Sequence, residues 1–165
     1  MADPGLTGIL LAGGTSSRFG SPKELAEYEG ETLGDRAWRL LGEACDERLA
    51  VGPGGLADPG TGPVAAIAVG LRAAAHELAV VIPVDMPLLT GEALRQLAVA
   101  CRDAAVAQAG PLPCALARRV LPAFETGERR LRTVLAGLDT TRIELPQRLL
   151  ANVNEPADLH RIGPR

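Results

Sequence analysis

Aromatic side chains are scarce in this sequence. They account for 2% of its 165 residues, against 47% for hydrophobic residues as a whole. The four are Phe19, Tyr28, Trp38 and Phe124. Proteins that hold single-stranded nucleic acid stack bases on aromatic rings, and a net charge of −3 gives no general attraction to phosphate polymers. We therefore expect an aliphatic core and no nucleic-acid partner.

Cysteines and long apolar runs are also few. Cys45, Cys101 and Cys114 are odd in number, far apart and without a C-x-x-C pair, so neither a disulfide framework nor a zinc site is expected. No stretch approaches the roughly 20 apolar residues that a membrane-spanning helix needs. The start, Met1 to Pro4, lacks the basic region of a signal peptide. These absences predict a cytoplasmic protein with no membrane partner.

Lysine is almost absent, and the exception lies where a cation has a chemical use. Lys23 is the only lysine, and the other 16 of the 17 basic residues are arginines. It ends a loop, Ala12 to Lys23, that is rich in glycine and small hydroxyl residues. Lysine offers a compact, mobile point charge that the planar fork of arginine does not replace. The pattern predicts a functional Lys23, with an ordinary surface lysine as the alternative.

The loop before Lys23 has the composition of a phosphate-binding loop. It follows a short apolar strand and contains Gly13, Gly14 and Ser16, whose small size lets backbone N–H groups approach a ligand closely. Arg18 adds a second type of cation. The spacing fits neither G-x-x-x-x-G-K-[ST] nor G-x-G-x-x-G. The loop is therefore predicted to hold phosphate in an arrangement that differs from both common nucleotide loops.

The hydrophobic patterns predict a single α/β domain over residues 1–165, because this length suits one core rather than two. The opening unit is a strand at Leu6–Leu11, the glycine loop, and a helix after Thr32 with Asp35 as its capping partner. Further strands are expected at Arg48–Val51, Leu78–Val84, Ala104–Ala107, Leu112–Leu116 and Arg142–Leu145. Further helices are expected over Val64–Ala75, from Thr90, over Leu131–Leu138 and from Asn154.

An acid stands at the end of the predicted central strand. Asp85 follows an apolar run, and in open α/β sheets ligands bind at the carboxyl ends of the strands. The loop that ends at Lys23 leaves the sheet at the same edge. A carboxylate beside nucleotide phosphates suits Mg²⁺, which takes one or two carboxylates together with phosphate oxygens and water. A turn or helix-capping aspartate is the alternative.

The run from Leu11 to Lys23, L-A-G-G-T-S-S-R-F-G-S-P-K, resembles the signature of the molybdenum cofactor guanylyltransferases. These are nucleotidyltransferases of the nucleotide-diphospho-sugar transferase fold, which implies a three-layer α/β/α Rossmann-like domain with a mainly parallel mixed sheet. The resemblance implies that Asp85 is the magnesium ligand and that Arg18, Lys23 and Asp85 are catalytic. It implies nucleotide contacts from Leu11, Ala12, Gly13, Gly14, Ser16, Lys23, Asp58 and Asp85.

Two further segments carry the resemblance. Residues 152–159, N-V-N-E-P-A-D-L, look like the closing segment of the family's sequences. In the family this segment brings an Asn or Asp towards the metal and the phosphates, so the resemblance implies that Asn154 contacts one of them. A helix N-cap is the alternative for Asn154. Asp58 precedes Gly62-Pro63, which resembles the G-P-L-A-G segment, with Ala66 in place of its second glycine. A solvated loop aspartate is the alternative for Asp58.

The segment that would face the acceptor matches the family's sequences less well. Pro113 to Arg118 is similar to the P-L-C-A-L-Y-R strand of the family, with Ala117 where an aromatic residue is usual. Five arginines are candidates to hold an anionic acceptor, with a solvated surface as the alternative for most of them. They are Arg118, Arg119, Arg129, Arg130 and Arg132.

The sequence contains no evident pair of nucleophile and base. A phosphate monoester acceptor needs little general base, because its second pKa of about 6 leaves it largely dianionic at neutral pH. The protein then aligns the acceptor with the α-phosphate and neutralises the leaving pyrophosphate through Lys23, Arg18, the loop N–H groups and Mg²⁺ on Asp85. The residues are those that nucleotidyl transfer needs.

The resemblance implies transfer of GMP from GTP to the phosphate of molybdopterin, with Mg²⁺ as cofactor and with contacts to molybdoenzymes or their chaperones. Gly13 favours GTP, since relatives that use CTP tend to have alanine there. The oligomeric state does not follow from the sequence. Three alternatives stay open: a related nucleotidyltransferase with CTP or another small phosphate acceptor, a non-catalytic GTP-binding protein, and a nicotinamide-dependent dehydrogenase, which the glycine spacing disfavours.

Overall fold

The protein folds around one six-stranded sheet. The computed structural model describes residues 5–12 and 25–162. The strands of the sheet are β1 (Leu6–Leu11), β4 (Glu47–Val51), β5 (Leu78–Pro83), β6 (Ala104–Ala107), β7 (Gly110–Ala117) and β8 (Thr140–Ile143). Their order across the sheet is β4-β1-β5-β7-β6-β8, and only β7 runs against its neighbours. The expectation of a mainly parallel, mixed sheet is confirmed.

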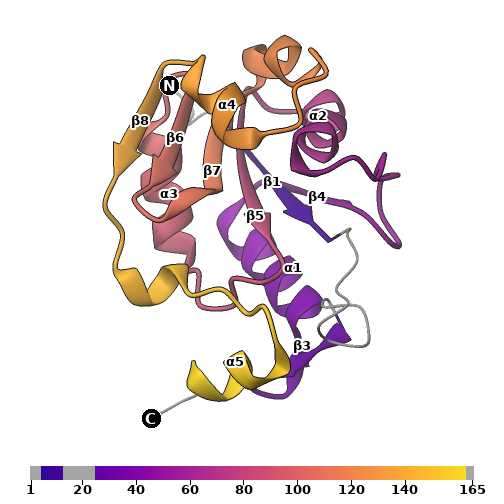
Figure 1. Cartoon of the computed structure of the whole chain (residues 1–165), viewed down its shortest axis with the longest axis vertical. Helices are drawn as coiled ribbons and strands as arrows, with labels where there is room; N and C mark the ends of the chain where they lie inside the picture. Colours follow the sequence, from indigo (N-terminus) through magenta and orange to yellow (C-terminus); the bar gives the residue numbers. More distant parts are fainter. Residues whose placement is uncertain (1–4, 13–24, 163–165) are drawn as a thin grey trace.

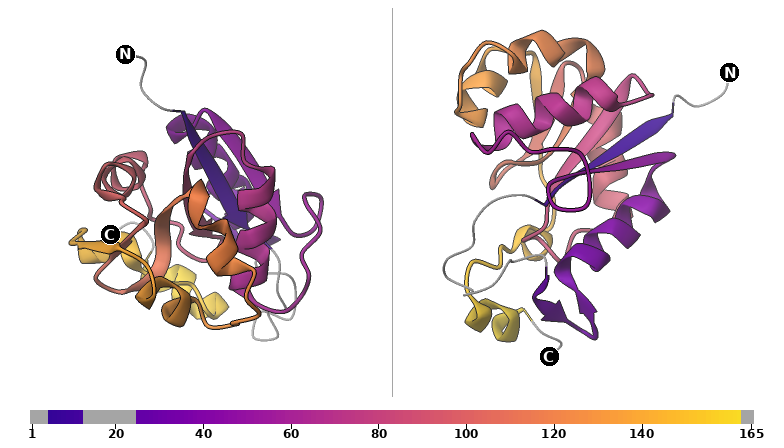
Figure 2. Two further views of the ribbon diagram at one scale, coloured as in Figure 1. Left: turned by 90° about the horizontal axis from the view of Figure 1, so that it is seen from above. Right: turned by 90° about the vertical axis from the view of Figure 1, so that its right-hand side faces the viewer.

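Helices cover both faces of the sheet, which confirms the three-layer architecture. The helices are α1 (Leu33–Ala44), α2 (Pro63–Ala73), α3 (Gly91–Ala100), α4 (Leu131–Ala136) and α5 (Pro156–Arg161), with 3-10 turns η3 (Arg118–Phe124) and η4 (Gln147–Leu150). A two-stranded hairpin, β2 (Glu27–Tyr28) and β3 (Glu31–Thr32), precedes α1. Figures 1 and 2 show α1 and α3 on one side of the sheet and α2, η3 and α4 on the other. None of the helices in the described residues is long and apolar enough to span a bilayer.

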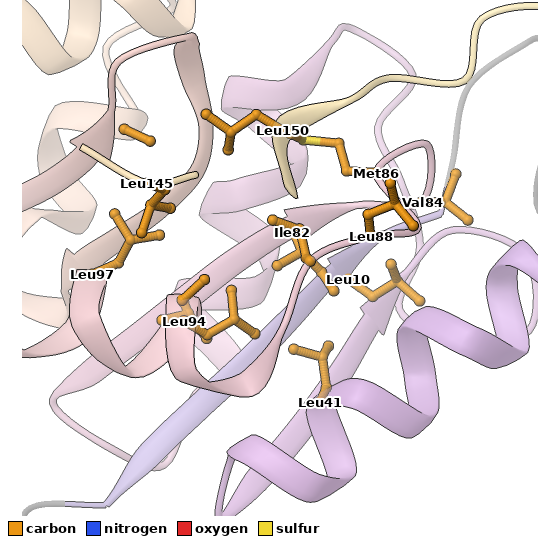
Figure 3. Packing of buried hydrophobic residues seen from close by; sticks show 14 of the residues in the cluster. Leu10, Leu41, Ile82, Val84, Met86, Leu88, Leu94, Leu97, Leu145 and Leu150 are labelled. Carbon is orange, nitrogen blue, oxygen red and sulfur yellow. The ribbon is translucent and has the colours of Figure 1, made fainter. Parts of the chain in front are cut away.

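The core is aliphatic, as the composition predicts. Alternate residues of β1 point to opposite faces, so that Ile9 packs with the α2 side and Leu10 with the α1 side. Figure 3 shows Leu10, Leu41 and Ile82 meeting between the sheet and α1. Because both faces of the central strands are buried, they read as continuous apolar runs in the sequence.

Local capping explains where two helices begin. The Thr32 hydroxyl accepts a hydrogen bond from the Asp35 N–H at 3.0 Å, and the Thr90 hydroxyl accepts one from the Ala93 N–H at 3.2 Å. Both caps satisfy N–H groups that the first turn of a helix leaves without partners. The predicted starts of α1 and α3 are therefore confirmed.

Several predicted boundaries are wrong, and helices α2 and α4 end at Ala73 and Ala136 rather than at 75 and 138. The last strand is Thr140–Ile143 rather than 142–145, because buried Leu145 packs into the core beyond the end of the strand. Helix α5 is capped by Glu155 and not by Asn154, because Glu155 forms a reciprocal capping box with Asp158. The strand predicted at 112–116 extends from Gly110 to Ala117.

Candidate active site

The carboxyl ends of three parallel strands meet at one edge of the sheet. Leu11, the last residue of β1, pairs with Val51 of β4 on one side and with Pro83 of β5 on the other. The next residue, Ala12, is buried and donates its N–H to the Val51 carbonyl oxygen at 3.0 Å. Ala12, the last described residue before the predicted loop, therefore lies at this edge.

Most of the predicted loop lies beyond the part of the chain that the structure describes. Gly13, Gly14, Ser16, Arg18 and Lys23 are all outside the described residues. Their roles stay predictions from the sequence. The described part fixes the two ends of the loop, at Ala12 and at Leu25.

Asp85 lies at the same edge, two residues beyond β5. The residue is partly exposed, and its Oδ1 atom is buried. Its carbonyl oxygen accepts a hydrogen bond of 2.8 Å from the N–H of Val153, which is fully buried. This long-range contact holds the segment around Val153 against the end of β5.

Asn154 directly follows Val153, so its backbone lies at the Asp85 edge, and its contact with a metal or with phosphates stays a prediction. Asn152 and Asn154 flank Val153 and are both exposed. The Asp158 Oδ2 atom accepts the Asn154 N–H at 2.9 Å and the Glu155 N–H at 3.0 Å, which fixes the backbone at this point. The amide side chain of Asn154 does not serve as the helix cap, so that alternative is excluded.

Asp85 is the candidate metal ligand at this edge. Within residues 5–12 and 25–162, no group of three or more His, Cys, Asp or Glu side chains forms a ready-made metal cage. Mg²⁺ keeps several waters and binds through one or two carboxylates plus substrate phosphates. The Asp85 carboxylate is one ligand of that kind, and the backbone of Asn154 lies one residue from the Val153 N–H that bonds to the Asp85 carbonyl oxygen.

The loop between β4 and α2 borders the same edge. The Asp58 Oδ1 atom accepts the Gly60 N–H at 2.8 Å, and this turn shapes the loop. The Arg129 Nε atom donates to the Thr61 carbonyl oxygen at 3.4 Å, which ties the loop to the segment before α4. Asp58 therefore has a structural role in a turn, and its predicted contact with the nucleotide stays a prediction.

A groove of about 660 Å³ opens beside Ala12. It runs between the first two turns of α1, the outer strand β4 and the loop after β4, where Pro53, Gly54 and Gly55 line it. Trp38 of α1 also lines it, with the Arg48 guanidinium 4.4 Å from the ring centroid. The sequence patterns did not indicate this groove, because its walls come from segments that only the parallel pairing of β1 with β4 brings together.

The structure separates the candidate acceptor arginines into two groups. Arg118 and Arg119 lie at the opposite, amino-terminal edge of β5, where they pair with Glu77 and Asp103 at 3.8 Å and 2.9 Å. Their predicted role with an acceptor is therefore not supported by their position. The other three, Arg129, Arg130 and Arg132, lie at or near the start of α4, on the side of the Asp85 edge.

The thiols are not prepared for nucleophilic chemistry. Burial raises the pKa of Cys101 to about 11 and that of Cys45 to about 12. Cys114 is completely buried, and burial raises its pKa further. All three remain protonated thiols at neutral pH, which agrees with a transfer reaction that forms no covalent intermediate with cysteine.

Comparisons with known proteins extend these observations. The profile of a family described as MobA-like NTP transferase domain matches residues 8–143. The chain is 36% identical to a probable molybdenum cofactor guanylyltransferase of Deinococcus radiodurans, with 97% of this chain and 95% of that protein covered. It is 35% identical to a protein of the same description from Mycobacterium tuberculosis, with 94% and 92% covered.

Solved structures show the same fold at lower identity. A nucleotidyl transferase from Methanothermobacter thermautotroptrophicus superposes with a TM-score of 0.82 at 20% identity, and covers 96% of this chain and 95% of its own. Molybdopterin-guanine dinucleotide biosynthesis protein A from Archaeoglobus fulgidus gives a TM-score of 0.72 at 20% identity, with 94% and 96% covered.

Proposed function

The chain belongs to the MobA-like NTP transferase domain family, and on this premise we propose that it transfers GMP from GTP to the phosphate of molybdopterin and releases pyrophosphate. The observation that carries the proposal is the meeting of three sequence signals at one edge of the sheet. These are the entry to the glycine loop at Ala12, the carboxylate of Asp85, and the Asn152–Asn154 segment held there by Val153.

Asp85 is the residue that would hold the magnesium ion, with Asn154 as a further contact. When bound, Mg²⁺ supplies charge neutralisation for the phosphates at which negative charge develops. Lys23 and Arg18 are proposed to bind the same phosphates, with Gly13, Gly14 and Ser16 contributing N–H donors from the loop. The acceptor phosphate is itself the nucleophile, so the protein needs to align it rather than to deprotonate it.

The groove beside Ala12 is the proposed site of the nucleoside. Its volume of about 660 Å³ falls in the range of small-molecule sites. Gly54 and Gly55 line the groove without side chains, which lets a base approach the backbone closely. Gly13 favours the larger purine over cytosine, although one methyl group is worth only about 1 to 3 kcal/mol of discrimination.

The proposal is tested first by nucleotide binding. We expect Mg²⁺ plus GTP to raise the thermal unfolding midpoint by a few degrees, since a ligand at about 100 times its dissociation constant adds about 2.7 kcal/mol. ATP, CTP and NAD are measured in parallel, and Lys23→Ala is expected to abolish the shift. A shift with CTP alone would replace GTP in the proposal by CTP, and a shift with NAD alone would contradict nucleotidyl transfer.

Activity is the second test. Wild-type protein with GTP, Mg²⁺ and molybdopterin is expected to release pyrophosphate, and GTP without the acceptor is not. GTP binding without pyrophosphate release would favour a non-catalytic GTP-binding protein. Contact with molybdoenzymes or their chaperones, and a cytoplasmic location, remain predictions that this assay does not address.

A further inference from the structure

A second, smaller pocket lies on the α4 face of the sheet. Its volume is about 160 Å³, and it is bounded by α4, by the start of β7 and by the paired strands β6 and β8. The only polar or charged side chains among its eight lining residues are Arg132, Thr140 and Arg142. The Thr140 hydroxyl already donates to the Leu135 carbonyl oxygen at 2.7 Å. Two arginines therefore share one small cavity whose lining contains no acid.

The two arginines come from different elements and converge on the pocket. Arg142 stands on β8 opposite Val106 of β6. Arg132, in the first turn of α4, reaches back over the start of β7, where a Cβ added to Gly110 would lie 3.4 Å from its Nη2 atom. The glycine thus lets the guanidinium lie directly against the backbone of β7.

Neither arginine is neutralised by a neighbour in the described part of the chain. The ion pairs there engage other arginines, among them Arg36, Arg39 and Arg119, and none engages Arg132 or Arg142. Two positive charges together in a concave site attract an anion, and both arginines are exposed and accessible to one. A guanidinium also offers paired donors that match the oxygens of phosphate or carboxylate.

The pocket is close to the proposed reaction centre. Strand β7 lies next to β5 in the sheet and runs in the opposite direction, so its first residue, Gly110, lies at the same edge as Asp85. Neighbouring strands are about 5 Å apart, and the strands that bound the pocket, β7, β6 and β8, are one, two and three strands away from β5. Both places lie on the same side of the molecule as the carboxyl edge of β5, so one acceptor that extends along this edge would contact both.

We propose that Arg132 and Arg142 form an oxyanion subsite for the acceptor, which binds a phosphate or carboxylate group other than the phosphate that attacks the nucleotide. The cavity suits one such group, because sites for whole ligands are about 300 to 1,000 Å³. This assignment to the acceptor rests on the proposed function. The anion site itself does not, and it is tested without nucleotide or acceptor.

Inorganic phosphate is the probe for the anion site. Titration at low ionic strength is followed through the amide NMR signals of Gly110 and Arg142, with Arg132→Gln and Arg142→Gln as the test variants. Each variant is expected to weaken phosphate binding at this site about three- to tenfold, as loss of one of two exposed charged partners does. Arg95→Gln removes an equally exposed arginine from α3, away from the pocket, and is expected to change nothing.

The variant Lys23→Ala distinguishes phosphate binding at this pocket from phosphate binding at the glycine loop. Phosphate binding reported by Gly110 and Arg142 is expected to persist in Lys23→Ala. If it disappears there and persists in both arginine variants, phosphate binds at the loop and the subsite is overturned. Absence of any phosphate-dependent shift at Gly110 in the wild type also overturns it.

Kinetics with molybdopterin test whether the anion belongs to the acceptor. Arg132→Gln and Arg142→Gln are expected to raise the KM for the acceptor about three- to tenfold, while the GTP-induced shift of the unfolding midpoint stays at its wild-type value. An unchanged acceptor KM in both variants overturns the assignment to the acceptor. Loss of the GTP-induced shift in the wild type would instead overturn the proposed function, whatever the phosphate titration shows.

Discussion

Asp85 combines a position fixed by backbone contacts with a carboxylate at the ligand edge. Its carbonyl oxygen is engaged by the Val153 N–H, so the backbone there stays in place when the side chain is changed. Asp85→Asn keeps the shape of the side chain and removes its charge. The variant therefore separates a role in binding a cation from a role in folding.

We expect Asp85→Asn to lower the rate of pyrophosphate release by about 100-fold or more, because it removes a charge that acts where the phosphates react. The Mg²⁺-dependent part of the GTP-induced shift in unfolding midpoint should be lost as well. Asp139→Asn is the matched control, because Asp139 is exposed and lies at the opposite edge of the sheet. Full Mg²⁺-dependent activity in Asp85→Asn would show that Asp85 is not the metal ligand.

At the scale of single residues, the sequence identified Asp85 because an acid after an apolar strand is a local pattern. The contact of Asp85 with Val153 could not be predicted in this way, because it joins residues far apart in the chain. Arg142 was missed for the same reason. It gains its significance only from Arg132, which a different element brings to the same pocket.

At the scale of elements, the start of α1 forms part of the groove beside Ala12. Gly34 and Asp35 line the groove, and the Thr32 cap fixes the first turn that carries them. The stability of this turn therefore bears on the proposed nucleoside site.

Thr32→Ala removes the cap hydroxyl and is expected to lower the free energy of unfolding by about 1 kcal/mol. The unfolding midpoint should fall by about 2 to 4 °C for a domain of this size. Thr133→Ala is the control, because Thr133 is exposed within α4 and caps no helix. Equal destabilisation by both substitutions would contradict a specific capping role for Thr32.

The elements that the sequence predicted well have strong periodic patterns or clear caps, such as β1, α1 and α3. Those predicted poorly are short and lie late in the chain. Leu145 extended the apparent pattern of β8, yet it is buried by packing against the core outside the strand. Helix α5 is capped by Glu155 rather than by Asn154, because the reciprocal hydrogen bonds between Glu155 and Asp158 outweigh the preference for asparagine at the N-cap position.

At the scale of the whole molecule, the two edges of the sheet carry different groups. The carboxyl edge carries Asp85 and both pockets open near it, whereas the amino-terminal edge is closed by hydrogen-bonded acids. The Glu47 carboxylate accepts the Ala75 N–H at 2.9 Å and the Thr7 hydroxyl at 2.8 Å. We infer that this second edge serves stability, and its acids should then set how stability changes with pH.

The same edge contains a second acid of this kind. The Asp103 carboxylate accepts the Asp139 N–H at 3.0 Å and pairs with Arg119 at 2.9 Å. The hydrogen bond from the Asp139 N–H, followed by the bond from Arg119, holds the pKa of Asp103 below its ordinary value of 3.8. Hydrogen bonds from the Ala75 N–H and the Thr7 hydroxyl similarly hold the pKa of Glu47 below 4.5.

Both carboxyl groups have a lower pKa in the folded chain than in the unfolded one. Unfolding therefore takes up protons, and a low pH favours the unfolded state. Their contribution to the free energy of unfolding is complete above about pH 4.5 and is lost as the pH falls through the lowered values. Urea unfolding from about pH 6 to about pH 3 should therefore show a loss of stability that Glu47→Gln and Asp103→Asn each make smaller. Glu92→Gln, an exposed acid of α3, is the control and should leave the loss as it is in the wild type. An unchanged loss in both test variants would mean that acids elsewhere govern the loss of stability, and the assignment of this role to the amino-terminal edge would be wrong.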